Sequence, residues 1–229
     1  LKGGKKTFRN KEMLHNPVHN GNLIATVRYH NDGQSSVSII DGKSGKTIEN
    51  IPAPDSLQLV ETAYLKDILY ATAISENGYG IYALDGEWKV TLSPQPVMIK
   101  DFKSYGDDLI FACDRTGVNE LYHFNPSTGS LRQKTSTRYG AADFTYSQDG
   151  SMLYYSSQTV MGKHIFRTPA KSLLDRNVRF DSLYKYPIAE KIKEQETAAA
   201  KKQGFDKAVT VKDEDVRISE PKRYRKVPH

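Results

Sequence analysis

Short apolar segments recur along the chain at nearly constant spacing and are separated by polar turns that contain glycine. One series of strand-like segments starts at Leu23, Ile68, Leu109 and Met152. A second series starts at Val37, Ile81, Leu121 and Ile165. Within each series the starts are 40 to 45 residues apart. Two series with one period indicate a repeat architecture rather than a single continuous sheet.

The turns have the chemistry that tight β-hairpins require. Asn31-Asp32-Gly33 and Arg115-Thr116-Gly117 each join a strand of the first series to one of the second. The strongest hairpin signal is Gln148-Asp149-Gly150, which lies between the aromatic segment 144–147 and the apolar segment 152–157. Glycine supplies the positive φ of such turns without steric cost. Each unit is therefore predicted to contain four strands joined by turns, which is one blade of a β-propeller.

Two motifs resemble the repeat of TolB-like (WD-like) β-propellers. One is Asp114-Arg115-Thr116-Gly117 with the strand that follows it, and the other is Tyr146-Ser147-Gln148-Asp149-Gly150. The chain has Gln148 where that family usually has proline. The resemblance covers about residues 15–176. It implies a β-propeller fold but says little about function, because propellers host many unrelated activities.

The resemblance also bears on the size of the parent protein. TolB-like wheels usually have about six to eight blades, and four blades rarely close a wheel alone. We therefore expect the chain to be a fragment of a larger periplasmic or outer-membrane protein of Bacteroidetes type. The stretch Pro221-Lys222-Arg223-Tyr224 is similar to the linker that joins such propellers to an outer-membrane domain.

The predicted fold class is all-β, with about four propeller blades and a short helical and extended C-terminal extension. Residues 1–14 are expected to be a basic segment or the remainder of a preceding blade, 15–176 the blades, and 177–229 the extension. Within the extension, residues 189–203 are rich in Ala, Glu, Lys and Gln and predict a helix. A basic linker follows that helix.

Charge changes the prediction of partners. The formal net charge is +6, and 26% of the residues are charged. Much of the excess lies at the two ends, at Lys2, Lys5, Lys6, Arg9 and Lys11 and at Lys222, Arg223, Arg225 and Lys226. No regular basic stripe follows the repeats, so we predict no nucleic-acid partner and solvated basic termini. Contact of these termini with anionic lipid headgroups is the alternative.

No segment approaches the roughly 18 apolar residues of a membrane helix, so no membrane span is predicted. The N-terminus also lacks the apolar region of a signal peptide, which a fragment could have lost.

Catalytic motifs are sparse in this sequence. It contains no Gly-x-Ser-x-Gly, His-Glu-x-x-His, Walker or Cys-x-x-Cys motif. His15 and His19 have the spacing of a helical metal pair, but Asn16-Pro17 makes the segment extended. His123 and His164 fall on strands, where packing or rim positions are expected, and the single Cys113 is predicted to be a buried small hydrophobe.

The acidic residues of the repeats are interpreted as turn formers, because a turn carboxylate accepts nearby backbone N–H groups. They are Asp32, Asp41, Asp85, Asp114 and Asp149. We accordingly predict no catalytic residue, no metal site and no cofactor.

Two functions remain compatible with these features. The first is a non-enzymatic interaction or scaffold module that binds a protein, peptide or glycan through rim loops or the channel mouth. The alternative is an accessory or substrate-gating propeller of a larger peptidase-like hydrolase. The first hypothesis places the protein in the periplasm or at the outer membrane.

Overall fold

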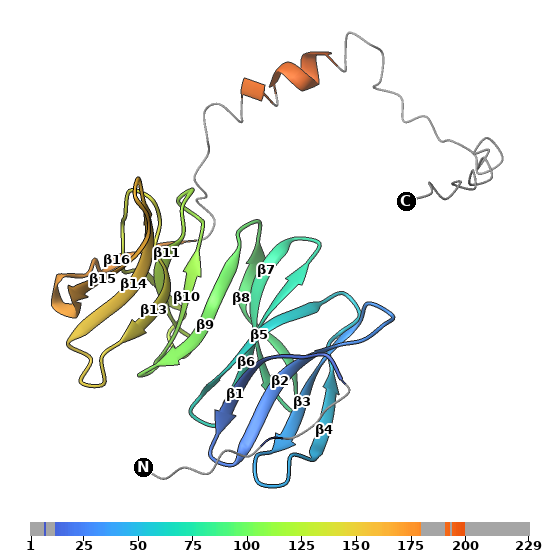
Figure 1. Ribbon diagram of the computed structural model, residues 1–229. Helices are drawn as coiled ribbons and strands as arrows, with labels where there is room; N and C mark the ends of the chain where they lie inside the picture. Colours follow the sequence, from blue (N-terminus) through green and yellow to red (C-terminus); the bar gives the residue numbers. More distant parts are fainter. Residues whose placement is uncertain (1–6, 8–11, 180–190, 193, 200–229) are drawn as a thin grey trace, which may run out of the picture. The chain divides into compact units, whose positions relative to one another are not determined.

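The computed structural model describes residues 7, 12–179, 191–192 and 194–199. Residues 12–179 fold into four antiparallel sheets in which consecutive strands are neighbours (Figure 1). The first sheet contains β1 (Leu14–Asn20), β2 (Leu23–Tyr29), β3 (Ser35–Asp41) and β4 (Thr47–Pro52). The second contains β5 (Gln58–Leu65), β6 (Ile68–Ser75), β7 (Gly78–Asp85) and β8 (Glu87–Gln95).

The third and fourth sheets follow the same order. The third contains β9 (Ile99–Tyr105), β10 (Asp108–Cys113), β11 (Glu120–Asn125) and β12 (Ser130–Gln133), with β16 (Arg176–Asn177) at its outer edge. The fourth contains β13 (Ala142–Tyr146), β14 (Met152–Thr159) and β15 (Gly162–Pro169). Each strand start that the sequence period predicts lies within three residues of an observed strand start.

Successive sheets pack face to face, and their first strands are in contact from β1 to β5, from β5 to β9 and from β9 to β13. Three apolar clusters fill the interfaces between neighbouring sheets. The arrangement is a partial β-propeller, and the predicted fold class is confirmed. Helical residues 191–192 and 194–199 lie within the predicted helix; residues 200–229 and most of 1–14 lie outside the described residues.

The second strands of the second and third sheets, β6 and β10, are largely apolar on both faces because each lies between two neighbouring sheets. In β10, Leu109 and Phe111 contact the second sheet, whereas Ile110 and Ala112 contact the fourth. All four side chains are buried. A short continuous apolar run is the sequence signature of such a doubly covered strand.

The Gln148-Asp149-Gly150 turn has the predicted geometry. Gly150 adopts φ +70°, a conformation that glycine tolerates well. The Asp149 carboxylate accepts bonds from the Ser147 hydroxyl (2.6 Å) and from the backbone N–H of Ser151 (3.1 Å). These bonds, the Ser147 hydroxyl first, lower the pKa of Asp149 to about 2. Asp149 is therefore a turn residue that caps the start of β14.

The fourth sheet has three strands where the repeat pattern predicts four. After Pro169 a 3₁₀ turn, η1 (Ala170–Ser172), redirects the chain, and β16 then pairs with β12 of the third sheet. The backbone N–H of Leu174 donates to Lys134 O (3.0 Å), and that of Val178 donates to Leu131 O (3.0 Å). Because these donors bond to the third sheet, β15 stays an edge strand.

The helical residues that the structure describes form no segment long and apolar enough to cross a membrane.

Candidate functional site

One end of the strands carries the connections best suited to recognition. Strands alternate in direction, so the turns between the second and third strands lie at the same end as the connections between sheets. We call this end the crossover face. Loops on a rigid scaffold are where binding residues concentrate. Two hollows open on this face, one between the first and second sheets and one between the third and fourth.

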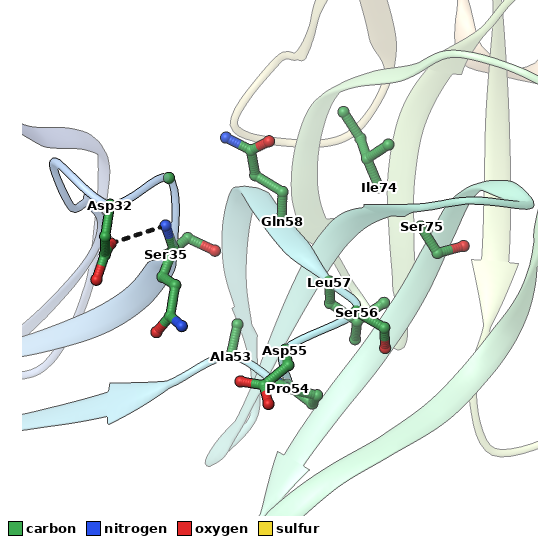
Figure 2. Close-up of a pocket in the computed structure, with 12 residues that line it drawn as sticks. Asp32, Ser35, Ala53, Pro54, Asp55, Ser56, Leu57, Gln58, Ile74 and Ser75 are labelled. Atoms are coloured by element: carbon green, nitrogen blue, oxygen red, sulfur yellow. Dashed lines mark hydrogen bonds between the residues drawn. The ribbon is translucent and has the colours of Figure 1, made fainter. Parts of the chain in front are cut away.

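The larger hollow, which we call the acidic pocket, has a volume of about 350 Å³. Asp32 comes from the β2–β3 turn, and Asp55 comes from the β4–β5 connection; both are exposed. The ends of β6 contribute Ile74 and Ser75, as Figure 2 shows. Among the residues that the structure describes, no Lys, Arg or His lines this pocket.

Hydrogen bonds around the buried Ser35 fix the two walls of the acidic pocket relative to each other. The Ser35 hydroxyl oxygen accepts the backbone N–H of Leu59 (2.9 Å), and its carbonyl accepts the N–H of Ala53 (2.9 Å). Asp32 accepts the N–H of Gln34 (3.0 Å), which orders the turn. The pocket is thus preformed, which reduces the entropy lost when a ligand binds.

The chemistry of the acidic pocket favours a cationic guest. Its two carboxylates come from separate loops and have no basic side chain beside them in the lining. Carboxylates form their strongest hydrogen bonds with ammonium and guanidinium groups. Gln34, Ser56 and Gln58 add neutral polar groups along the lining.

The second hollow, about 190 Å³, differs in charge. Lys100 and Lys163 line it together with Asn119 and Tyr139. The Lys163 ammonium already donates to Asp143 (2.8 Å). That bond, together with the Ser156 hydroxyl, holds the pKa of the Asp143 carboxyl below its usual range. The positive charge of this hollow is therefore partly used inside the protein.

A buried Asp–His–Tyr arrangement joins the third and fourth sheets. His123 is 6% exposed; its Nδ1 lies 3.1 Å from Asp108 Oδ2, and its Nε2 lies 2.9 Å from the Tyr146 hydroxyl. Because a carboxylate only accepts, Nδ1 carries the proton and Nε2 accepts from Tyr146. Tyr146 stacks on Tyr105 with ring centroids 4.0 Å apart.

Burial decides the protonation of this arrangement. It lowers the pKa of His123 to about 4, even though the Asp108 bond acts in the opposite direction. Burial likewise raises the pKa of the Tyr146 phenol. The imidazole is therefore neutral at pH 7 with both nitrogens engaged. We assign the arrangement to joining two sheets rather than to acid–base chemistry.

The acidic residues singled out in the sequence do not form one site. Asp32, Asp41, Asp114 and Asp149 accept backbone N–H groups. Asp85 differs, because it ends β7 and forms an ion pair with Lys89 (3.7 Å). Of the five, Asp32 lines the acidic pocket. Its neighbour there, Asp55, could not be paired with it from the sequence because the two come from different connections.

The remaining predicted residues lie apart from the acidic pocket. His15 and His19 are on β1, and His164 is on β15. Cys113 is fully buried, as predicted, and burial raises the pKa of its thiol to about 12. Across residues 12–179, no three His, Cys, Asp or Glu side chains lie together as metal ligands would.

Sequence reasoning missed a set of polar residues at bulges of the first strands, which we call the bulge series. Asn16 Nδ2 donates to Val60 O (3.0 Å). Glu61 accepts the N–H of Phe102 (2.7 Å), and Asp101 accepts the N–H of Asp143 (3.0 Å). These links span 44, 41 and 42 residues, which is the repeat period. A search for polar residues at that period could have found them.

Comparisons with known proteins show the fold. The sequence matches no protein-family model and no curated protein. TolB from Acinetobacter baumannii is similar in structure, with a TM-score of 0.60, 17% identity, and coverage of 74% of this chain and 44% of TolB. A puromycin-hydrolysing peptidase from Mycobacterium tuberculosis gives a TM-score of 0.51, 12% identity, and coverage of 74% and 31%.

A chain of a nidogen/laminin complex gives a TM-score of 0.54, 10% identity, and coverage of 68% of this chain and 60% of that one. The chain therefore spans less than two thirds of each of these proteins.

Proposed function

We propose that the protein is a non-enzymatic β-propeller interaction module whose acidic pocket binds a lysine or arginine side chain of a protein or peptide partner. One observation carries the proposal. Asp32 and Asp55 are exposed on two different walls of a preformed pocket, and within residues 12–179 no basic side chain lines it. A lysine or arginine side chain that enters the pocket can pair with a carboxylate from either wall.

Several features support this choice over the alternatives. The nidogen/laminin likeness is to a chain in a protein complex, and the likeness to a peptidase is one of fold alone. In the Asp–His–Tyr arrangement described above, the imidazole of His123 is buried. A glycan would be expected to meet an aromatic platform, whereas the acidic pocket is lined by aliphatic and polar side chains.

We further propose a periplasmic or outer-membrane-associated location, in line with the TolB-like repeat.

The proposal is tested by selecting phage-displayed peptides on the wild-type protein. We expect the selected peptides to be enriched in lysine or arginine. Asp32→Asn with Asp55→Asn should weaken their binding by about 1.5- to 5-fold per carboxylate removed, the range of exposed ion pairs. Titration calorimetry at two salt concentrations measures the loss, since screening should weaken wild-type binding.

The matched control is Asp107→Asn. Asp107 is an exposed carboxylate in the β9–β10 turn, at the opposite end of the strands, and it pairs with Lys66 (3.0 Å). It should leave peptide binding unchanged. Selected peptides without a cation, or equal binding by the double variant and the wild type, would refute the proposed function.

A further inference from the structure

The second hollow of the crossover face, which we call the basic hollow, repeats the position of the acidic pocket two interfaces further along the chain. Both are lined by the residue before the third strand of one sheet, by the connection to the next sheet and by the end of that sheet's second strand. Asn119 thus matches Gln34, and Gln158 matches Ile74. Because the scaffold repeats while the side chains differ, the two hollows suit different ligands.

The lining of the basic hollow carries positive charge that the protein does not fully use. Lys163 is bonded to Asp143 (2.8 Å), and Asp101 also acts on this ammonium group. Neither carboxylate lines the hollow. Lys100 lines it and forms no hydrogen bond or ion pair with any residue that the structure describes. Lys100 is therefore available to pair with an anionic ligand.

The same hollow has a polar atom in its lining residues that lacks a partner. Asn119 Oδ1 is shielded from water and has no hydrogen-bond partner within residues 12–179. A buried acceptor without a donor is unfavourable, so a ligand that donates an N–H to it gains affinity. A carboxylate alone brings only acceptors. The basic hollow therefore fits a ligand in which an anionic group and an N–H lie close together.

Hydrogen bonds hold the basic hollow in shape. The Asn119 carbonyl accepts the N–H of Ala141 (2.6 Å), and the Gly140 carbonyl accepts the Ser157 hydroxyl (2.5 Å). The volume of about 190 Å³ is that of about six water molecules, which suits one small polar group. Tyr139 also lines the hollow and is 48% exposed, so its ring offers a surface to a neighbouring side chain.

We propose that the basic hollow binds the last residue of a polypeptide partner. The α-carboxylate of that residue pairs with the Lys100 ammonium, and its backbone N–H donates to Asn119 Oδ1. Its side chain packs on the Tyr139 ring. An aspartate or glutamate side chain is a poorer fit, because its carboxylate lies one or two bonds further from the nearest backbone N–H.

The C-terminal end of this chain is a poor occupant because it is strongly basic. Its last residues include a group of cations, at Lys222, Arg223, Arg225 and Lys226. Placing them beside Lys100 and Lys163 would oppose binding through like-charge repulsion. A partner whose last residues are neutral or acidic meets no such repulsion.

The test is an NMR titration of the 229-residue protein with the peptide acetyl-Gly-Gly-Phe, followed at the backbone N–H signals of residues 139–142. Amidation of the peptide carboxylate should weaken binding by about 10-fold or more, because charge-assisted hydrogen bonds are lost. Lys100→Gln should weaken binding of the free acid by about 2- to 5-fold. Lys89→Gln, at an exposed position of the outer strand β8, is the matched control and should bind like the wild type.

N-methylation of the last peptide bond tests the role of Asn119, since it removes the N–H. It should weaken binding to the wild type by about 2- to 10-fold and should have little further effect in Asn119→Ala. Asp32→Asn with Asp55→Asn should leave binding of acetyl-Gly-Gly-Phe unchanged, so this proposal and the proposed function succeed or fail separately.

Three results would overturn the proposal. The first is equal binding of the free-acid and amidated peptides. The second is binding of an amidated peptide with an internal aspartate as tightly as the free acid, which would assign the basic hollow to side-chain carboxylates. The third is no binding at millimolar peptide, the result expected if other residues of the chain already fill the hollow.

Discussion

Lowering the pH from 7 to 4.5 is expected to reduce the free energy of unfolding by about 2–3 kcal/mol through His123 alone. The imidazole has a pKa of about 4 in the folded protein and an ordinary value of 6.5 when exposed. Between these values the unfolded chain binds a proton that the folded protein does not, so stability falls as the pH falls. The loss begins near pH 6.5 and is complete near pH 4.

Burial is the main reason why the imidazole resists protonation; among the groups around it, Asp108 opposes this effect and two basic residues add to it. Asp108 and the Tyr146 hydroxyl occupy its two nitrogens, and Tyr105 lies edge-on to the ring. Arg132 and Lys134 add positive charge nearby, which disfavours the imidazolium further. Protonation would also place an N–H against the Tyr146 oxygen, and the Tyr146 hydroxyl would then have to turn away.

Urea unfolding at several pH values compares the wild type with His123→Gln, which cannot gain the proton. The variant should be less stable at pH 7 but should lose much of the pH dependence between 6.5 and 4. Glu61 and Glu120 act in the opposite direction, because burial raises their pKa and folding then becomes more favourable as the pH falls. Subtracting the stability–pH curve of His123→Gln from that of the wild type cancels the contribution of the two glutamates.

The control is His164→Gln, at an exposed position of β15. This variant should keep the wild-type dependence of stability on pH. The same pH dependence in all three proteins would disprove the role of His123.

Replacing Gly78 with alanine is expected to destabilise the protein by about 3 kcal/mol or more. Gly78 begins β7 with φ +101°, a conformation that side chains rarely adopt. A Cβ atom there would lie 2.0 Å from the backbone oxygen of Gln95 on β8. Since the obstacle is backbone, relief requires the pairing of β7 with β8 to shift. Thermal and urea unfolding measure the loss.

The control for Gly78→Ala is Gly86→Ala. Gly86 lies in the turn after β7 with φ +71°, and a Cβ atom there would meet nothing within 4 Å. It should cost only about 1 kcal/mol, from backbone strain. If both variants lost the same stability, the close approach of Gln95 would not be the cause.

Periodicity revealed the second and third strands of each sheet because their apolar segments recur at one spacing. In the two inner sheets β6 and β10 are also covered on both faces. The first strands were harder to recognise, since bulges interrupt their alternation. Asn16, Asp101 and Asp143 adopt φ between 50° and 56° at these bulges. Such residues resemble loop residues in a sequence, although they lie inside β1, β9 and β13.

The candidate site was less accessible to prediction than the fold. Asp32 was recognised as a turn former, and that role remains compatible with its place in the acidic pocket. Nothing in the sequence around Asp55 indicates a binding residue, because its partner across the pocket comes from another turn. The contact of His123 with Tyr146 likewise depends on how the third and fourth sheets pack. Pairings of this kind are set by tertiary structure rather than by local pattern.

The bulge series gives the molecule the character of a linear array. Each of its links joins one sheet to the next, over 44, 41 and 42 residues. In such arrays stability is approximately a sum of unit and nearest-neighbour contributions, so opening starts at an end and moves inward. The fourth sheet has a single covered face and one open edge, whereas the second and third are covered on both faces. Local unfolding should therefore begin at β15. Any polypeptide that covers that strand would slow the unfolding of all four sheets.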